Sequence, residues 1–371
     1  VQRANTGVTM ATMEPQSSFD RQSRQLLAAV LAGRRDRVAL LLDTGRARAS
    51  CADPEGTSPL MLAAAAGDAA IARDLLRRGA PVNQRRRSGA TALFYACQAG
   101  RADLAELLLS NGADPSLPVS GRLGGSPLMA AAQNGHADCL RLLLSAGAPV
   151  DWRGAGADGA TALQLACWHD RRQCAQLLLA AGARPLLARR DGATPLSAAA
   201  QRGSADLCRA LLSAAPEFSS AASPADLAAV GAALLRACRA GHTEAVRAIL
   251  NCGGRPFPAG HFGACLHAAA LFGHSDTAEV LLAAGASPVA QDSSGRLPAD
   301  CALAGGHSEL HQRLLGLETE ASLLQQREQL DGPRRPSELS ASMAGGEAEF
   351  ACNDLPGEQG FTDFGDDCDL W

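Results

Sequence analysis

The sequence predicts an all-α protein, built as a solenoid of stacked helix pairs. Three observations indicate this fold. A segment of about 33 residues recurs along the chain, five copies keep a Leu four residues after an opening Gly and a sixth keeps it three residues after, and most copies end in a Leu-rich stretch closed by another Gly. Apolar residues make up 47% of the chain but aromatic residues only 4%, so the apolar content is mostly the helix formers Ala and Leu. Short units of this kind bury their apolar faces against their neighbours.

The copies keep a strict register. Their opening glycines are separated by 33, 35, 35, 33 and 39 residues and lie at Gly56, Gly89, Gly124, Gly159, Gly192 and Gly231. The Leu that follows each of them, here called the register leucine, is Leu60, Leu93, Leu128, Leu163, Leu196 and Leu234. The series continues with Leu266 and more weakly with Ala299, and a degenerate first copy spans Leu26 to Gly33. We therefore expect about nine units.

Each unit predicts two short antiparallel helices. In "GATPLSAAAQRG", the Thr194 hydroxyl is placed to cap the first helix, and Pro195 lies where a missing N–H costs nothing. The second helix carries a pair of leucines, such as Leu75 and Leu76, and ends at a Gly suited to the left-handed conformation, such as Gly79. Equivalent caps are expected at Ser58, Thr91, Ser126 and Thr161.

The pattern G-x-T-P-L-x-x-A-A-x-x-G-H…L-L-L-x-x-G-A, seen in "DGATPLSAAAQRG", "QNGHADCLRLLLSAGAPV" and "LHAAALFGHSDTAEVLLAAGASP", resembles the ankyrin repeat. The resemblance covers residues 21–316 and implies β-hairpin fingers between units, a curved stack and a short ankyrin-only protein. One departure is "SAAPEFSSAASPADLAAVG", which inserts six residues before the sixth full unit. We expect a distorted finger and a looser stack at 215–230.

The ends of the chain differ from the repeats in composition. We expect a disordered N-terminal segment at 1–20, a helical extension at 317–330, and a disordered acidic tail at 331–371. No basic residue follows Arg335, whereas nine acidic residues do. The end of the tail, "FTDFGDDCDLW", interleaves aromatic residues with acids. This composition is typical of a short linear motif or an activation-type segment, and equally of a solubilising tail.

Several function classes are disfavoured. The net charge of −4 argues against a nucleic-acid partner, and no window of 18 apolar residues predicts a membrane span. No apolar leader is visible in the first 20 residues, so we expect a protein of the cytoplasm or the nucleus. We also expect a monomer. The cysteines, such as Cys97 and Cys167, recur at equivalent helix positions, and four of the eight histidines occupy the repeat's Gly-His position. We therefore expect no metal, no cofactor and no catalytic site.

The positions that a repeat leaves free are those that bind partners. In the ankyrin family these are the fifth and sixth residues after the register leucine, together with finger residues near the opening Gly, and they line a concave face. Trp168 and Phe272 occupy such slots beside arginines, which is typical of a binding hot spot. The full predicted set is Arg87, Gln98, Arg122, Gln133, Asn134, Trp168, His169, Arg190, Gln201, Arg202, Arg239, Leu271 and Phe272, with Arg85, Arg86, Arg189 and Arg296 beside the fingertips.

Asn83 has two interpretations. Its place in "GAPVN" is similar to the finger asparagines that an asparaginyl hydroxylase modifies in this family, and it is also an ordinary turn residue.

The sequence thus predicts a non-catalytic interaction module that binds a protein partner, acidic in character, through the concave face. One alternative is a substrate-recruiting adaptor of a ubiquitin ligase, because all 34 basic residues are Arg and none is Lys. Codon usage explains the same bias. A second alternative is a transcriptional co-regulator that acts through the acidic tail. The opposite charges of tail and fingers also predict that the tail docks onto the repeats.

Overall fold

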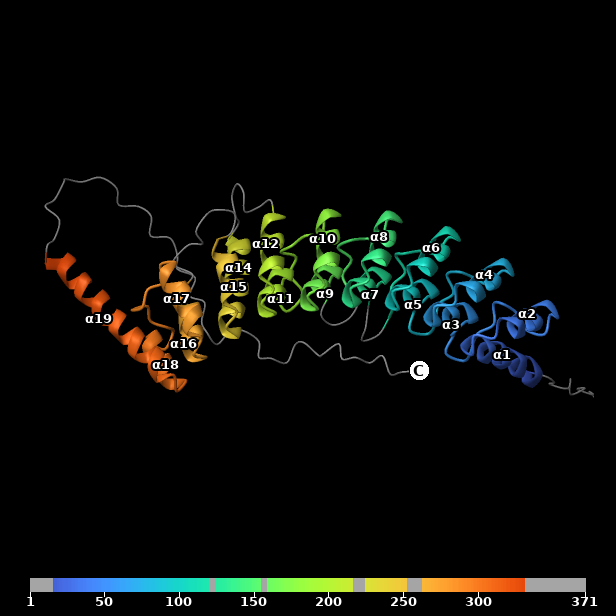
Figure 1. The fold of residues 1–371 in the computed structure, drawn as a ribbon, viewed down its shortest axis with the longest axis horizontal. Helices are drawn as coiled ribbons and strands as arrows, with labels where there is room; N and C mark the ends of the chain where they lie inside the picture. The colour runs from blue at the N-terminus through green and yellow to red at the C-terminus, as the bar shows by residue number, and fades with distance from the viewer. Residues whose placement is uncertain (1–15, 121–124, 155–158, 216–223, 252–261, 331–371) are drawn as a thin grey trace, which may run out of the picture. The chain divides into compact units, whose positions relative to one another are not determined.

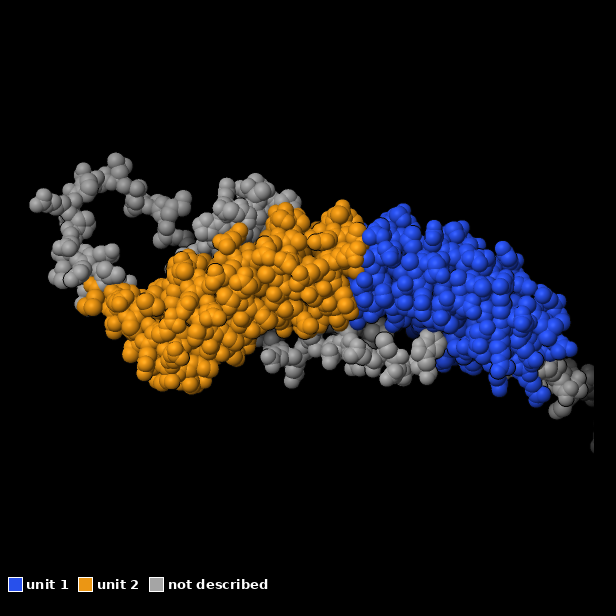
Figure 2. Space-filling model, in the orientation of Figure 1, with its two compact units in different colours: residues 1–156 blue, residues 157–371 orange. Residues whose placement is uncertain are grey.

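A computed structural model describes residues 16–120, 125–154, 159–215, 224–251 and 262–330. The chain divides into two compact units, residues 1–156 (unit 1) and residues 157–371 (unit 2), coloured separately in Figure 2. The described ranges contain helices and turns and no β-strand. Within these same ranges, every helix is too short or too polar to cross a lipid bilayer.

Unit 1 contains four helix pairs (Figure 1). The first helices of the pairs pack against one another in a row, as do the second helices, so the unit has two layers. The first-helix layer is α1 (Gln16–Leu31), α3 (Pro59–Ala66), α5 (Ala92–Gln98) and α7 (Pro127–Asn134). The second-helix layer is α2 (Arg35–Asp43), α4 (Ala69–Arg77), α6 (Ala102–Ser110) and α8 (Ala137–Ser145).

Unit 2 repeats the same two layers with five pairs (Figure 1). Its first helices are α9 (Ala162–Trp168), α11 (Pro195–Gln201), α14 (Pro224–Ala240), α16 (Gly263–Leu271) and α18 (Pro298–Ala304). Its second helices are α10 (Arg172–Ala180), α12 (Ala205–Ser213), α15 (Thr243–Leu250), α17 (Ser275–Ala283) and α19 (Ser308–Leu330). The last helix includes the whole range 317–330.

The predicted caps are confirmed. Thr194 accepts a hydrogen bond from the Ser197 N–H at 3.1 Å, and Pro195 begins the helix α11 behind it. Ser58, Thr91, Ser126 and Thr161 cap their helices in the same way. Gly79 and its equivalents have positive φ, as the left-handed end of a helix requires.

The core follows the register. Every register leucine from Leu60 to Leu266 is buried, and Ala299 is buried in the last pair. Each first helix presents mostly alanines to its neighbours, which lets adjacent helices approach closely. In the second helices one leucine of each pair, for example Leu75, is fully buried. Burying a leucine side chain contributes about 2 kcal/mol, so the stack depends on these leucines.

The prediction for the sixth full unit is wrong in one respect. Gly231 does not open that unit but lies inside α14, which has 17 residues where its neighbour α11 has seven. Ala232 and Ala233 stand where other units have a capping hydroxyl and Pro. The signal that starts a first helix is therefore missing at this point, and α14 begins earlier, at Pro224. Val230 is consequently part of the buried core. Residues 216–223 lie outside the described residues.

The helix α1 begins at Gln16, before the boundary expected at residue 20. Residues 1–15 and the acidic tail, 331–371, lie outside the described residues.

The fingers are turns rather than strands in the described ranges. The Gly89 N–H donates to the Arg86 carbonyl at 2.7 Å, and the Arg86 N–H donates to the Ala90 carbonyl at 2.9 Å. Adjacent fingers of unit 1 are joined by single backbone bonds, such as Arg87 N–H to Glu55 O at 2.9 Å. One bond per finger does not make a ladder, so the expected β-hairpins are not confirmed.

Candidate functional site: an arginine–aromatic strip on unit 2

Five side chains form a continuous strip at or near the ends of the first helices of unit 2. They are Trp168, Arg202, Arg236, Arg239 and Phe272, which we call the arginine–aromatic strip. They belong to α9, α11, α14 and α16 or to the residue that ends the helix, and these four helices pack side by side in that order. The repeat register therefore converts positions far apart in sequence into one row.

Trp168 and Arg202 form one end of the strip. Trp168 is the last residue of α9 and is half-buried, whereas Arg202 ends α11 and is exposed. The guanidinium carbon of Arg202 lies over the indole ring, 6.0 Å from its centroid. A cation over an aromatic face is attractive by about 0.5–1 kcal/mol at an exposed site, so each side chain orients the other.

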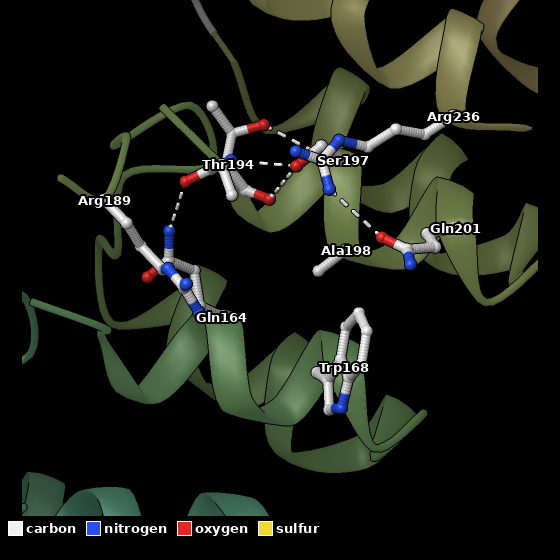
Figure 3. A pocket seen from close by; sticks show the side chains of 9 residues that line it. Gln164, Trp168, Arg189, Thr194, Ser197, Ala198, Gln201 and Arg236 are labelled. Atoms are coloured by element: carbon white, nitrogen blue, oxygen red, sulfur yellow. Dashed lines mark hydrogen bonds between the residues drawn. The ribbon is translucent and has the colours of Figure 1, made fainter. Parts of the chain in front are cut away.

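Arg236 occupies the middle of the strip. Its Nη1 donates to the Gln201 side-chain oxygen at 3.1 Å, and the buried Nε has no hydrogen-bond partner. Figure 3 shows Arg236, Gln201 and Trp168 around Ala198, at a shallow pocket that Gln164 and Arg189 also line. The free volume is ≈ 10 Å³, about what one water molecule needs. The pocket fits one polar atom next to Arg236 and is too small for a small-molecule ligand.

Phe272 and Arg239 form the other end. Phe272 is 45% exposed and the adjacent Leu271 is 41% exposed. The Arg239 guanidinium lies 5.7 Å from the Phe272 ring centroid, and the His274 imidazole stacks on the same ring with centroids 6.3 Å apart. An apolar side chain is thus held at the surface by charged and polar neighbours.

Two histidines fix the backbone that carries the strip. The His242 Nε2–H donates to the Gln201 carbonyl at 3.0 Å, and the His274 Nε2–H donates to the Arg239 carbonyl at 3.1 Å. Each bond reaches from the start of a second helix back to the preceding pair. The Gly-His position of the repeat thereby satisfies carbonyls at the end of a first helix that have no partner within that helix.

The charges of the strip are unbalanced. Arg202, Arg236 and Arg239 have no carboxylate at ion-pair distance among the described residues. Other arginines of unit 2 do: Arg172 and Arg209 pair with Asp206, Arg189 with Asp191, Arg247 with Glu244, Arg296 with Asp292 and Arg313 with Glu279. The acidic residues of this unit thus compensate arginines elsewhere and leave the strip positive.

Burial lowers the pKa of the Arg236 guanidinium; Asp191 opposes this effect, and Arg189 and Arg239 add to it. Arginine nevertheless stays charged at any physiological pH. Burial alone would raise the pKa of Asp191, but the Ala193 N–H and the Arg189 guanidinium together hold that pKa below its usual value. Asp191 therefore stays ionised as the partner of Arg189.

The predicted residues of unit 1 form a different surface. Gln98 is exposed, and its carbonyl accepts from the Asn134 side chain at 3.3 Å and from His136 Nε2 at 3.2 Å. Gln133 is half-buried. Arg87 is exposed and pairs with Glu55 at 3.2 Å. These residues are amides or already neutralised, so they lack the free charge and the aromatic rings of the strip.

The remaining sequence-predicted residues are dispersed. Arg122 lies outside the described residues, Arg190 is exposed, and His169 is half-buried next to Trp168. The placement of Arg189 at a fingertip is wrong. It is buried, and its Nη2 donates to Asp191 at 2.6 Å, because the turn that its N–H closes with the Ala193 carbonyl folds the side chain inward.

Sequence reasoning missed Arg236. It lies two residues after its register leucine, where Leu62 and Leu165 are buried in their units. An arginine at a register position that elsewhere holds a buried apolar residue is the signal that would have found it.

Asn83 has a clear structural role. Its Nδ2 donates to the Gly112 carbonyl at 3.0 Å, and its Oδ1 accepts from the Asp114 N–H at 2.9 Å. The side chain is exposed and bridges two consecutive turns of unit 1. Its hydroxylation stays a prediction.

The nine cysteines in the described part of the chain are free and buried, and burial raises the pKa of the Cys208 thiol to about 12. In that part no three His, Cys, Asp or Glu side chains are grouped so that they could hold a metal ion.

Known proteins with similar sequences define the class. A family model described as ankyrin repeats matches residues 26–119, 117–189 and 234–326, and a single ankyrin repeat model matches residues 191–219. Since these matches cover most of the chain, it belongs to the ankyrin repeat family.

Among curated proteins, it is similar to an ankyrin repeat-containing protein of Treponema pallidum (strain Nichols), with 42% identity over 92 residues, 24% of this chain and 30% of that protein. The human ankyrin repeat domain-containing protein 63 is 37% identical over 98 residues, 25% of this chain and 26% of that protein. The zebrafish (Danio rerio) ankyrin repeat and SAM domain-containing protein 6 is 42% identical over 85 residues, 23% of this chain and 12% of that protein. The chain thus spans less than a third of each of these relatives.

Proposed function

We propose that this protein is a non-catalytic interaction module that binds a protein partner through the arginine–aromatic strip of unit 2. Ankyrin repeats are generally protein–protein interaction modules, and the strip supplies what a hot spot needs. The observation that carries the proposal is Phe272, 45% exposed beneath Arg239. Exposed aromatic residues and arginines with no acidic partner favour a partner surface that is apolar and acidic.

The mechanism is presentation on a rigid surface. Trp168 is the last residue of α9, which Thr161 caps, and Phe272 follows α16, which packs between α14 and α18. His242 and His274 fix the carbonyls of Gln201 and Arg239. Side chains that are ordered before binding lose little entropy on binding. Arg202 and Arg239 shield the rings from water and attract carboxylates.

The test compares the full-length chain with two variants as baits in a proximity-labelling or pull-down experiment. The site variant combines Trp168→Ala with Phe272→Ala. The matched control combines Leu31→Ala with Leu40→Ala, which removes two exposed apolar side chains from unit 1. We expect proteins that the wild type and the control retain and the site variant loses.

For a partner identified in this way, we expect Trp168→Ala to cost about 2 kcal/mol or more of binding free energy, a loss of roughly 30-fold in affinity by calorimetry. Identical capture by all three baits would contradict the proposal.

A second function is favoured by one observation. All 34 basic residues are Arg, which leaves no side-chain acceptor for ubiquitin and fits a substrate-recruiting adaptor of a ubiquitin ligase in the cytoplasm or nucleus. Co-purification of a cullin with the full-length chain supports this function, and its absence under conditions that retain other partners argues against it.

A further inference from the structure

We propose that the acidic end of the chain's own tail, residues 361–371, binds the arginine–aromatic strip and competes with an external partner. This inference rests on the proposed function, because it assigns the same strip a second, intramolecular occupant. The tail lies outside the described residues, and the proposal rests on the strip and on the sequence of the tail.

The first argument is charge. In the part of the chain that the structure describes, Arg202, Arg236 and Arg239 lie within one row without a carboxylate partner, and Arg239 is close enough to affect the pKa of Arg236. In the second-helix layer of unit 2, by contrast, acidic residues neutralise arginines. Asp206 pairs with Arg172 and Arg209, and Glu244 pairs with Arg247. Residues 361–371 contain four aspartates, Asp363, Asp366, Asp367 and Asp369, and no basic residue.

The second argument is the distribution of aromatic residues. The strip has a ring at each end and guanidinium groups between them: Trp168 and Arg202, then Arg236, then Arg239 and Phe272. The segment "FTDFGDDCDLW" has the complementary order, with Phe361 and Phe364 before the cluster of aspartates and Trp371 after it. Aromatic side chains that pack beside Phe272 or Trp168 bring the aspartates over the arginines.

The third argument is reach. Thirty residues, 331–360, separate the end of α19 from the segment, and a random-coil linker of thirty residues has a root-mean-square span of about 30 Å. A short flexible tether gives an effective concentration on the order of 1 mM. A segment whose separate dissociation constant is about 100 µM is then docked roughly 90% of the time. A weak contact is therefore sufficient.

The chemistry of the contact is specific to this strip. The half-buried Arg236 Nε lacks a hydrogen-bond partner, and the adjoining pocket holds about one polar atom. A carboxylate oxygen fits that need better than water, because both donor and acceptor are then ionised and their opposite charges attract. The corresponding positions of unit 1 carry Gln98, Gln133 and Asn134, which offer no charge to the tail.

The experiment measures binding of a fluorescent peptide with the sequence of residues 361–371 to the full-length chain by anisotropy. In a released variant, the four tail aspartates are changed to Asn, so that its own tail no longer competes. We expect the peptide to bind the released variant with a dissociation constant of about 10–100 µM, and to bind the wild type at least about tenfold more weakly. Equal affinity for both proteins would overturn the proposal.

Two sets of substitutions in the released variant locate the site. Arg202→Gln, Arg236→Gln and Arg239→Gln together should weaken peptide binding tenfold or more. The control set, Arg172→Gln, Arg209→Gln and Arg247→Gln, removes the same charge from the second-helix layer and should change binding less than twofold. Equal losses in both sets would mean that the peptide senses only net charge, and the proposal fails.

A peptide variant tests the contact without altering the protein. Replacing Phe361, Phe364 and Trp371 by Ala keeps every aspartate and should abolish measurable binding to the released variant. Unchanged binding would refute the aromatic contact.

If the peptide does not bind, while capture of external proteins still depends on Trp168 and Phe272, the tail proposal fails and the proposed function stands. If the peptide binds and no external protein depends on the strip, the proposed function fails and docking of the tail on the strip stands.

Discussion

Gly203 and His242 occupy one shared space between consecutive helix pairs. A Cβ built on Gly203 would lie 2.6 Å from the imidazole Nδ1 of His242, whose Nε2–H donates to the Gln201 carbonyl. Gly100 with His136, Gly241 with His274 and Gly273 with His307 repeat this arrangement. The Gly-His signature of the repeat is thus a steric match between adjacent pairs, and it fixes the backbone next to the strip residue Arg202.

We expect Gly203→Ala to destabilise the protein by about 2–4 kcal/mol. The new methyl group displaces the His242 ring, and a φ of +75° costs a non-glycine residue about 1–2 kcal/mol by itself. Gly182→Ala is the matched control, because its φ is +87° and nothing lies within 4 Å of the added Cβ. Urea unfolding, monitored by circular dichroism, measures the free energy of unfolding of both variants. Equal losses would show that the His242 ring moves aside without destabilising the protein.

The Arg189–Asp191 pair predicts a dependence of stability on acid pH. Because the pKa of Asp191 is held below its usual value, the stabilisation it provides is complete above the unfolded pKa of about 3.9. That stabilisation is lost as the pH falls through the lower pKa of the folded state.

Asp191→Asn should therefore cost about 1–3 kcal/mol at pH 7, because the buried Arg189 loses its partner, and should flatten the decline of stability below pH 4. Unfolding by urea at pH 7, 5 and 3 checks both effects. Asp138→Asn is the matched control, because the ion pair of Asp138 with Arg141 is exposed. An equal loss in both variants would contradict the prediction.

At Arg236, we expect the requirements of stability and of binding to oppose each other. Its register position holds a buried Leu in other units, Leu62 and Leu165. We expect Arg236→Leu to leave the free energy of unfolding unchanged or to raise it by about 1 kcal/mol, because a half-buried charge is replaced by an apolar side chain.

The same Arg236→Leu substitution should weaken binding of the tail peptide and of any partner that uses the strip. Thermal unfolding measures the effect on stability, and fluorescence anisotropy measures the effect on binding of the tail peptide. A loss of more than about 2 kcal/mol of stability would show that Arg236 is structural.

We expect the Asn83 side chain to stabilise the stacking of consecutive turns. Asn83→Ala removes two hydrogen bonds to the following turn and should cost about 1–2 kcal/mol. Asn111→Ala is the control, because the Asn111 side chain bonds only to Leu107 in its own helix. Urea unfolding of the two variants should separate them, and equal stabilities would leave Asn83 as an ordinary turn residue.

Much of the fold could be predicted because local signals repeat. A capping Thr194 before Pro195, a buried Leu196 and a left-handed Gly each depend on chemistry within a few residues, and each recurs at a fixed spacing. The departures arise where that chemistry is missing. Without a capping hydroxyl and Pro at residues 232–233, α14 extends back to Pro224.

The candidate site could be predicted only in part. The register points to Trp168 and Phe272 because it identifies slots that the core does not need, and their role in binding stays a prediction. Arg189 and Arg236 were misplaced or missed, because the side chain of an arginine follows its partners rather than its register. Arg189 turns inward to Asp191, and Arg236 lies against Gln201 of the preceding helix pair.

By itself, then, the sequence determined the repeat, the caps, the buried register leucines and the class of fold, since all of these follow from spacing along one chain. The tertiary structure decided which arginines are neutralised and which lie unpaired over aromatic rings. That outcome depends on distances between side chains of different helix pairs, about 35 residues apart in sequence, and only the stacking of the pairs sets those distances.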